Sequence, residues 1–264
     1  MYSAPMRLLL PISTGVLCLV AASVHAGSAL VLPHPHSIGS IPAGTYDDDG
    51  KRLGEATLYY ERTPDGKIHM RAATSVQDGP RNLINAVFEE IDEGRALRVL
   101  REDSLSHDEN GNPMVLVEVD HEKGVARCTP PGARDGDIQT IPLPADDRVA
   151  NATLGLLFQP LVRREVEQIE FQPFLCRGGA RLVDFVARAA ERSSREPSDQ
   201  VVEIRFGPKL GRVLSWLAGA VVPELRFWFD AAEGRYLAHR MPLYGGGPEV
   251  VVAREGVAAG ALPR

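Results

Sequence analysis

Short segments of alternating apolar and polar residues, separated by turn-forming residues, constrain the fold of this chain more than any other feature. The first two segments flank the tetrapeptide Thr63-Pro64-Asp65-Gly66, which is typical of a hairpin turn. Three such pairs follow one another: 55–62 with 67–75, 82–91 with 96–105, and 114–121 with 124–129. Alternation with a period of two is typical of half-buried strands, so this cadence predicts an antiparallel meander.

The second half of the chain continues the pattern. Segment 180–190 fits either a helix or a strand, and we favour a strand because the β-branched, alternating segment 200–206 follows a turn-like stretch and would complete a hairpin. Further strands are expected at 165–175, 225–230, 235–242 and 249–254. In segment 225–230, Leu225, Phe227 and Phe229 share one face, whereas Arg226, Trp228 and Asp230 share the other.

Two apolar segments have helical rather than strand periodicity. Segment 148–162 predicts a short helix that is interrupted by Pro160, with Asn151 as a candidate cap. Segment 210–222 has apolar residues at steps of three and four and stops at Pro223. Apolar helices set between strong strands favour a mainly β fold, in which a curved antiparallel sheet, a half-barrel or open barrel, holds one or two helices in its concave face.

The N-terminus has the composition of an export signal. A single positive charge, Arg7, precedes an apolar run from Leu8 to Ala22, and Val24-His25-Ala26 suits signal peptidase. We expect a signal peptide at 1–26, an extended leader at 27–42, a single β-rich domain at 43–256 and a flexible tail at 257–264. The run is short and broken by Pro11 and Gly15, so we expect no transmembrane segment after signal removal, and a periplasmic or secreted protein.

Charge and cysteine content limit the partners and the redox compartment. Without Arg7, 28 Lys and Arg residues stand against 35 Asp and Glu residues, which argues against nucleic acid as a partner. After signal removal two cysteines remain, Cys128 and Cys176, and in an oxidising compartment they are candidates for a disulfide. The alternative is a pair of separated buried thiols.

Sequence motifs give no support for catalysis or for a metal site. No Gly-x-Ser-x-Gly elbow is present, and neither cysteine lies in a nucleophile motif. His69, His239 and Asp230 lie on predicted strands and are explained more simply as exposed or hydrogen-bonded sheet residues. His34 and His36 offer two metal ligands, fewer than a site needs. We therefore assign no catalytic residue, metal or cofactor.

The C-terminal region, from Pro223-Glu224-Leu225-Arg226-Phe227-Trp228-Phe229-Asp230 through Tyr236 to Tyr244 and Gly247-Pro248-Glu249-Val250, resembles the end of exported bacterial proteins of unknown function. The order of signal, meander, short helix and Trp-containing hairpin is similar over most of the mature chain. The resemblance implies a curled antiparallel sheet and transfers no catalytic residue. The plan is also remotely similar to that of periplasmic lipoprotein carriers, whose half-barrel covers acyl chains.

Apolar helical residues are the candidate ligand-binding residues, namely Leu154, Leu157, Phe158, Leu214, Trp216 and Leu217. They could line a cavity, but packing into a core explains them without any ligand, and we favour the core because periodicity indicates burial and not what lies opposite. Our first hypothesis is an exported non-enzymatic protein that binds or carries a lipid or another apolar small molecule in the envelope. The alternative is a structural or interaction module with a packed core and an envelope protein as partner. A hydrolase without a recognisable motif is the third hypothesis.

Overall fold

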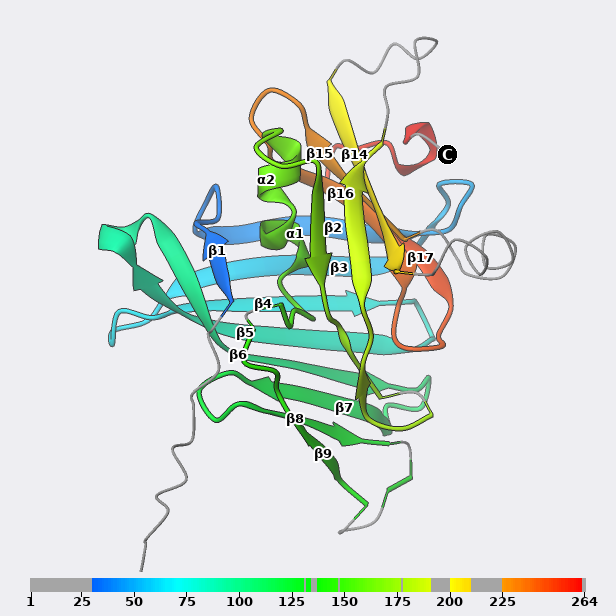
Figure 1. Cartoon of the computed structure of the whole chain (residues 1–264). Helices are drawn as coiled ribbons and strands as arrows, with labels where there is room; N and C mark the ends of the chain where they lie inside the picture. The colour runs from blue at the N-terminus through cyan, green and yellow to red at the C-terminus, as the bar shows by residue number, and fades with distance from the viewer. Residues whose placement is uncertain are drawn as a thin grey trace, which may run out of the picture.

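A single large antiparallel sheet curls around two short helices (Figure 1). The computed structural model describes residues 30–130, 132–133, 137–146, 148–176, 178–190, 200–209 and 225–262. In this part of the chain the sheet has 15 strands, and a second sheet has two. The predicted fold class, a mainly β protein with a curved, open antiparallel sheet and helices in its concave face, is confirmed.

The strands are β1 (Val31–Pro33), β2 (Gly39–Tyr46), β3 (Arg52–Arg62), β4 (Ile68–Ser75), β5 (Arg81–Ile91), β6 (Ala96–His107), β7 (Pro113–Asp120), β8 (Val125–Thr129), β9 (Gln139–Pro142), β10 (Gln168–Phe171), β11 (Phe174–Leu175), β12 (Arg181–Leu182), β13 (Phe185–Ala189), β14 (Val201–Pro208), β15 (Leu225–Asp230), β16 (Tyr236–Pro242) and β17 (Glu249–Arg254). The helices are α1 (Leu154–Leu157) and α2 (Gln159–Val162), and single 3-10 turns cover Asp92–Gly94 and Ala259–Ala261.

Strand order follows the chain except at three pairings, β1 with β6, β10 with β13 and β2 with β17. The order is β10-β13-β14-β15-β16-β17-β2-β3-β4-β5-β6-β7-β8-β9, with β1 paired to the start of β6. The predicted hairpins are confirmed as β3–β4, β5–β6, β7–β8 and β13–β14. The most distant of these pairings involves β2, which lies between β3 and the last strand, β17. The N-terminal and C-terminal halves of the sheet are therefore joined along β2.

The face alternation predicted for β15 is confirmed. Phe227 and Phe229 are buried in the main core, whereas Trp228 is buried in a separate cluster with Ala238, Val251 and Ala253 on the other face. The preference for strands in segment 180–190 is also confirmed, because β12 and β13 occupy it.

The helical segment differs from the prediction in two respects. Two four-residue helices replace one interrupted helix, and Pro160 lies in the first turn of α2, where its missing N–H leaves no helical bond unmade. Asn151 is not a cap: its amide exchanges hydrogen bonds of 2.9 and 2.8 Å with the backbone of Phe174. That prediction was wrong because Asn151 pairs with a strand residue distant in sequence. The helix predicted at 210–222 lies outside the described residues.

The N-terminal segment 27–42 already contributes strands, since it includes β1 and the beginning of β2. The segment predicted as a tail contains the 3-10 turn at Ala259–Ala261, and the predicted signal peptide lies outside the described residues. In the part of the chain that the structure covers, none of the helices is long and apolar enough to cross a bilayer.

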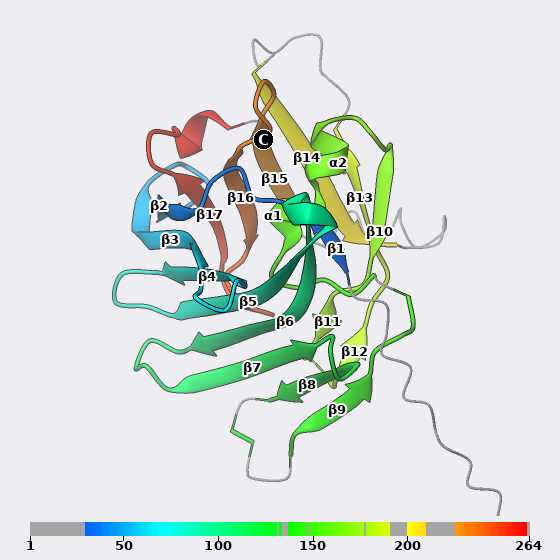
Figure 2. The same cartoon turned by 90° about the vertical axis from the view of Figure 1, so that its left-hand side faces the viewer.

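The two ends of the sheet, β9 and β10, are not paired with each other, and a seam separates them (Figure 2). The predicted disulfide between Cys128 of β8 and Cys176, just after β11, is confirmed, with a Cα–Cα distance of 5.5 Å. Its neighbours are Val119, Ala126 and Phe174, which are buried with Cys128 in one cluster. The disulfide therefore links the two sides of the seam.

Candidate functional site

A cavity of about 440 Å³ lies in the concave face of the sheet, beneath α1. Ligand pockets typically measure about 300 to 1,000 Å³, so this volume can hold a small molecule. Its walls come from strands on both sides of β2 and from the segment around α1. They comprise Pro35, His36, Ser37, Ile41, Ala43, Ala56, Thr57, Leu58, Tyr60, Met70, Ala72, Thr74, Ile84, Asn151, Ala152, Thr153, Leu154, Gly155, Leu156, Gln159, Phe227, Glu233, Arg235, Tyr236, His239, Met241, Val252 and Arg254.

The floor of the cavity is built from inward-facing residues of neighbouring strands. Register pairs Ile41 with Leu58, Leu58 with Ala72, and Ala72 with Ile84, which forms one apolar row across β2 to β5. Tyr60 and Met70 form the next row. Some of these positions hold alanine, although close-packed cores usually hold larger side chains there. The small side chains leave the cavity unfilled.

A buried carboxylate positions the roof of the cavity. Glu102 of β6 is 1% exposed and accepts hydrogen bonds from the backbone N–H groups of Asn151 and Ala152, both at 3.0 Å, and from the Thr153 hydroxyl at 2.8 Å. These donors compensate for the lost hydration of the carboxylate. Glu102 thus fixes the backbone immediately before α1.

Phe158 anchors the other end of α1 in the core. Its ring is fully buried, with centroids 5.8, 5.2 and 5.4 Å from those of Phe171, Phe206 and Phe227. Aromatic pairs at such distances and inclined angles are favourable. α1 is therefore held at both ends against the concave face of the sheet.

Two tyrosines and a histidine place polar atoms on the otherwise apolar wall. The Tyr236 hydroxyl lies 2.7 Å from His239 Nδ1 and 3.1 Å from the Val252 carbonyl oxygen. The His239 ring stacks on Phe227 with centroids 5.0 Å apart. Burial raises the pKa of Tyr60 and of Tyr236 above the usual range and lowers the pKa of His239 to about 4. All three side chains are therefore neutral near pH 7.

Charged groups in the wall are few. Glu233 and Arg235, in the turn between β15 and β16, form an ion pair of 2.8 Å. Arg254 ends β17 and is half-buried, and its side chain makes no ion pair or hydrogen bond within the described part of the chain. The wall therefore carries one excess positive charge.

The N-terminal segment crosses the edge of the cavity and is held by its two histidines. His36 Nε2 lies 3.3 Å from Gln159 Oε1, and Gln159 donates to the Gly234 carbonyl oxygen at 3.0 Å. His34 Nε2 lies 2.8 Å from Glu90. The Arg62 guanidinium, followed by His34, lowers the pKa of Glu90 to about 2. The two histidines thus have separate partners, and no group of three metal-ligating side chains occurs among the residues described.

The predicted ligand-binding residues fall into three groups. Leu154 lines the cavity, whereas Leu157 and Phe158 are buried in the core beside it. Leu214, Trp216 and Leu217 lie outside the described residues, so their role stays a prediction. Sequence analysis missed the polar members Tyr60, Tyr236 and Arg254. It assigned His239 to the sheet only, although its spacing to Met241 places both residues on one face.

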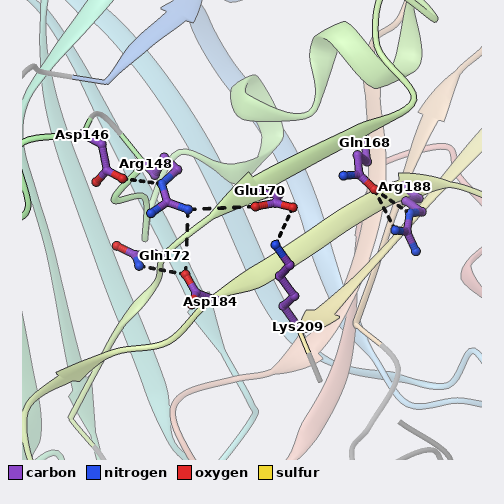
Figure 3. Close-up of polar contacts among 8 residues, drawn as sticks. All are labelled: Asp146, Arg148, Gln168, Glu170, Gln172, Asp184, Arg188 and Lys209. Atoms are coloured by element: carbon purple, nitrogen blue, oxygen red, sulfur yellow. Dashed lines mark hydrogen bonds and ion pairs between the residues drawn. The ribbon is translucent and has the colours of Figure 1, made fainter. Parts of the chain in front are cut away.

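A second polar cluster is formed by side chains of β10, β13 and the segments next to them (Figure 3). Arg148 contacts Asp146 at 2.6 Å, Asp184 at 3.9 Å and Glu170 at 4.0 Å, and Lys209 pairs with Glu170 at 2.7 Å. Nearby, Gln172 donates to Asp184, and Arg188 donates to Gln168. The charges in this cluster neutralise one another at the surface, so we assign it no ligand.

The side chains of the cavity are better suited to binding a ligand than to acid–base catalysis. A general base works best when its pKa lies near the operating pH, and the low pKa of His239 is far from neutrality. The hydrogen-bond partner of His239 is a tyrosine hydroxyl, which is neutral as well. The arrangement suits a molecule with a long apolar part and a small polar end.

No protein-family model matches the chain, and no curated protein matches it. Among solved structures, the chain is similar to the crystal structure of a beta-barrel-like protein of the domain of unknown function DUF1849 from Brucella abortus. The TM-score is 0.42 at 10% sequence identity, and the match covers 86% of this chain and 97% of that chain.

Proposed function

We propose that the protein is an exported, non-enzymatic β-rich protein that binds a lipid or another elongated apolar molecule in the cavity beneath α1. The observation that carries this proposal is the cavity itself, about 440 Å³ in volume and walled by apolar rows of the curled sheet. Burying each methylene of an alkyl chain contributes about 0.8 kcal/mol, so such a cavity favours an acyl chain. The architectural similarity to periplasmic lipoprotein carriers stays a prediction from the sequence.

Native mass spectrometry of protein purified from its own cells, before and after delipidation, tests the proposal. We expect an adduct that delipidation removes and that phospholipid or fatty acid restores. A protein that carries no adduct and gains none would contradict ligand binding.

A substitution that fills the cavity sharpens this test. Ala72→Leu adds volume to the apolar row between Leu58 and Ile84, and we expect it to reduce the adduct while the protein stays folded. The matched control is Ala73→Leu, because Ala73 is the next residue of β4 and does not line the cavity. Equal loss in both variants would assign the effect to general destabilisation.

The proposed location, periplasmic or secreted, rests on the sequence of the first 26 residues. We propose that the signal peptide is removed after Ala26 and that the β-rich domain functions without it. N-terminal sequencing of protein from the periplasmic fraction and the medium tests this. A chain that retains Met1 in the cytoplasmic fraction would contradict export.

A further inference from the structure

Arg254 is directed into the cavity by the alternation of β17. Val252, two residues earlier, also lines the cavity. The intervening Ala253 and the preceding Val251 belong to the cluster around Trp228 on the opposite face of the sheet. Because alternate residues of a strand share a face, the Arg254 side chain extends to the cavity side.

The guanidinium of Arg254 lacks a protein partner within the described residues. The carboxylate of Glu233 also lines the cavity, but it is already paired with Arg235 at 2.8 Å. Taking a cation out of water is costly unless an anion or several acceptors replace the water. A half-buried arginine in a mainly apolar wall therefore favours a ligand with an anionic group over one with a neutral polar group.

The position of Arg254 in the register relates it to the apolar floor. Pairing places Arg254 opposite Ala43, Ala43 opposite Ala56, and Ala56 opposite Thr74, which gives one row across β17, β2, β3 and β4. The two alanines are small and leave room for a bound group beside the guanidinium. The Thr74 hydroxyl can add a hydrogen bond to that group.

Apolar rows continue from this point along the strands. The next row on the same face holds Leu58, Ala72 and Ile84, and the row after it holds Tyr60 and Met70. Successive rows on one face of a sheet are about 7 Å apart, so these rows provide about 14 Å of apolar wall. This length suits an extended alkyl chain of about ten carbons.

We propose that the ligand is a fatty acid or a closely related long-chain carboxylate, whose head group pairs with Arg254 and whose chain lies along the rows of Leu58 and Met70. This inference rests on the proposed ligand-binding function and specifies the ligand class. One guanidinium matches one carboxylate through two parallel N–H···O bonds, and the neutral Tyr236 and His239 leave Arg254 as the charge that selects the head group.

Calorimetric titration of the purified, delipidated protein with decanoate and with decan-1-ol tests the proposal, because the two probes share a chain and differ in the head group. For the wild-type protein we expect decanoate to bind about tenfold to a hundredfold more tightly than the alcohol. Arg254→Gln should abolish this preference, because it weakens decanoate binding far more than alcohol binding. Arg254→Lys, which retains the charge, should keep part of the preference.

Arg188→Gln is the matched control, because it removes an exposed arginine that does not line the cavity and should keep the preference for decanoate. Equal affinities of the wild-type protein for acid and alcohol would overturn the fatty-acid inference and leave the proposed apolar-ligand function intact. Failure to bind either probe would overturn both. The comparison of decanoate with decan-1-ol in the wild-type protein does not depend on any variant. Thermal unfolding curves verify that each variant is folded. A decanoate preference that survives Arg254→Gln would also overturn the inference.

Discussion

Glu102 holds the segment before α1 through three hydrogen bonds while being removed from solvent. The imidazole of His121 is also buried, and its Nε2 lies 3.8 Å from the Glu102 carboxylate. Because hydrogen-bond donors replace water around the charge, the carboxylate can be buried and still position the roof of the cavity.

We expect Glu102→Gln to lower the free energy of unfolding by about 3 kcal/mol. A glutamine can accept with one oxygen, but its NH₂ group turns a donor toward backbone donors. Urea unfolding measures the change. The control is Glu122→Gln on the exposed turn that follows β7, which should change stability by less than about 0.5 kcal/mol. Equal effects of the two substitutions would contradict the role of Glu102.

His239 predicts a dependence of stability on pH. Its pKa is lowered to about 4 in the folded protein, so the unfolded chain takes up this proton first as the pH falls. The contribution of His239 to stability is therefore full above about pH 6.5 and decreases as the pH falls toward the folded pKa. Between about pH 6.5 and about pH 4.5 the loss should be about 2 to 3 kcal/mol.

Urea midpoints of the wild-type protein and of His239→Gln across this pH range measure the effect. The difference between the two proteins isolates His239 from other titrating groups. The wild-type protein should lose stability more steeply than the variant, and parallel pH profiles would contradict a His239 that is held neutral in the folded protein.

For individual residues, the sequence predicts only partly which side chains face the cavity. Periodicity identifies Leu154, Leu157 and Phe158 as buried, but it does not show that Leu154 borders empty space while Phe158 packs among aromatic rings. Glu102 and Arg254 lie at ordinary polar positions of alternating strands. Their roles depend on the segment that folds over them, which the local pattern does not encode.

At the scale of elements, local pairings were predictable and distant ones were not. The hairpins from β3 to β8 have short turns, so the turn residues fix both the partner and the register. The pairing of β2 with β17 joins segments from opposite ends of the chain, and no turn specifies it. The two short helices likewise depend on Glu102 and the aromatic core rather than on helix-forming sequence.

Gly54 is required where β3 passes close to the end of β4. A Cβ at this position would lie 2.0 Å from the Ser75 carbonyl oxygen, so Gly54→Ala must displace one of the strands. We expect this variant to be destabilised by about 2 kcal/mol or more in urea unfolding.

Gly207 of β14 provides the matched control for Gly54, since a Cβ there would meet no described atom within 4 Å. Gly207→Ala should be neutral or slightly stabilising because alanine restricts the unfolded chain. If both alanine variants have wild-type stability, the close approach at Gly54 does not occur.

At the scale of the whole molecule, the sheet ends at a seam that the disulfide spans. Cys128 and Cys176 are separated by 48 positions, and closing a loop of this size stabilises a protein by about 4 kcal/mol in the chain-entropy description. Cys128→Ala combined with Cys176→Ala should therefore lower the unfolding free energy by about this amount. Urea unfolding of the double variant measures the loss, and reduction of the wild-type protein should reproduce it. An unchanged midpoint would show that the packing around Phe174 holds the seam unaided.

The position of β2 between β3 and β17 gives the order of synthesis a role in forming the cavity. The hairpins from β3 to β8 can form as soon as they emerge, because their partners are adjacent in sequence. By contrast, one edge of β2 has no neighbour until the final strand is made, and Arg254 arrives with that strand. Until then the newly made chain has an unpaired strand edge that can pair with other chains, and the wall of the cavity is incomplete. If the proposed function is correct, a ligand binds only after the last strand has been made.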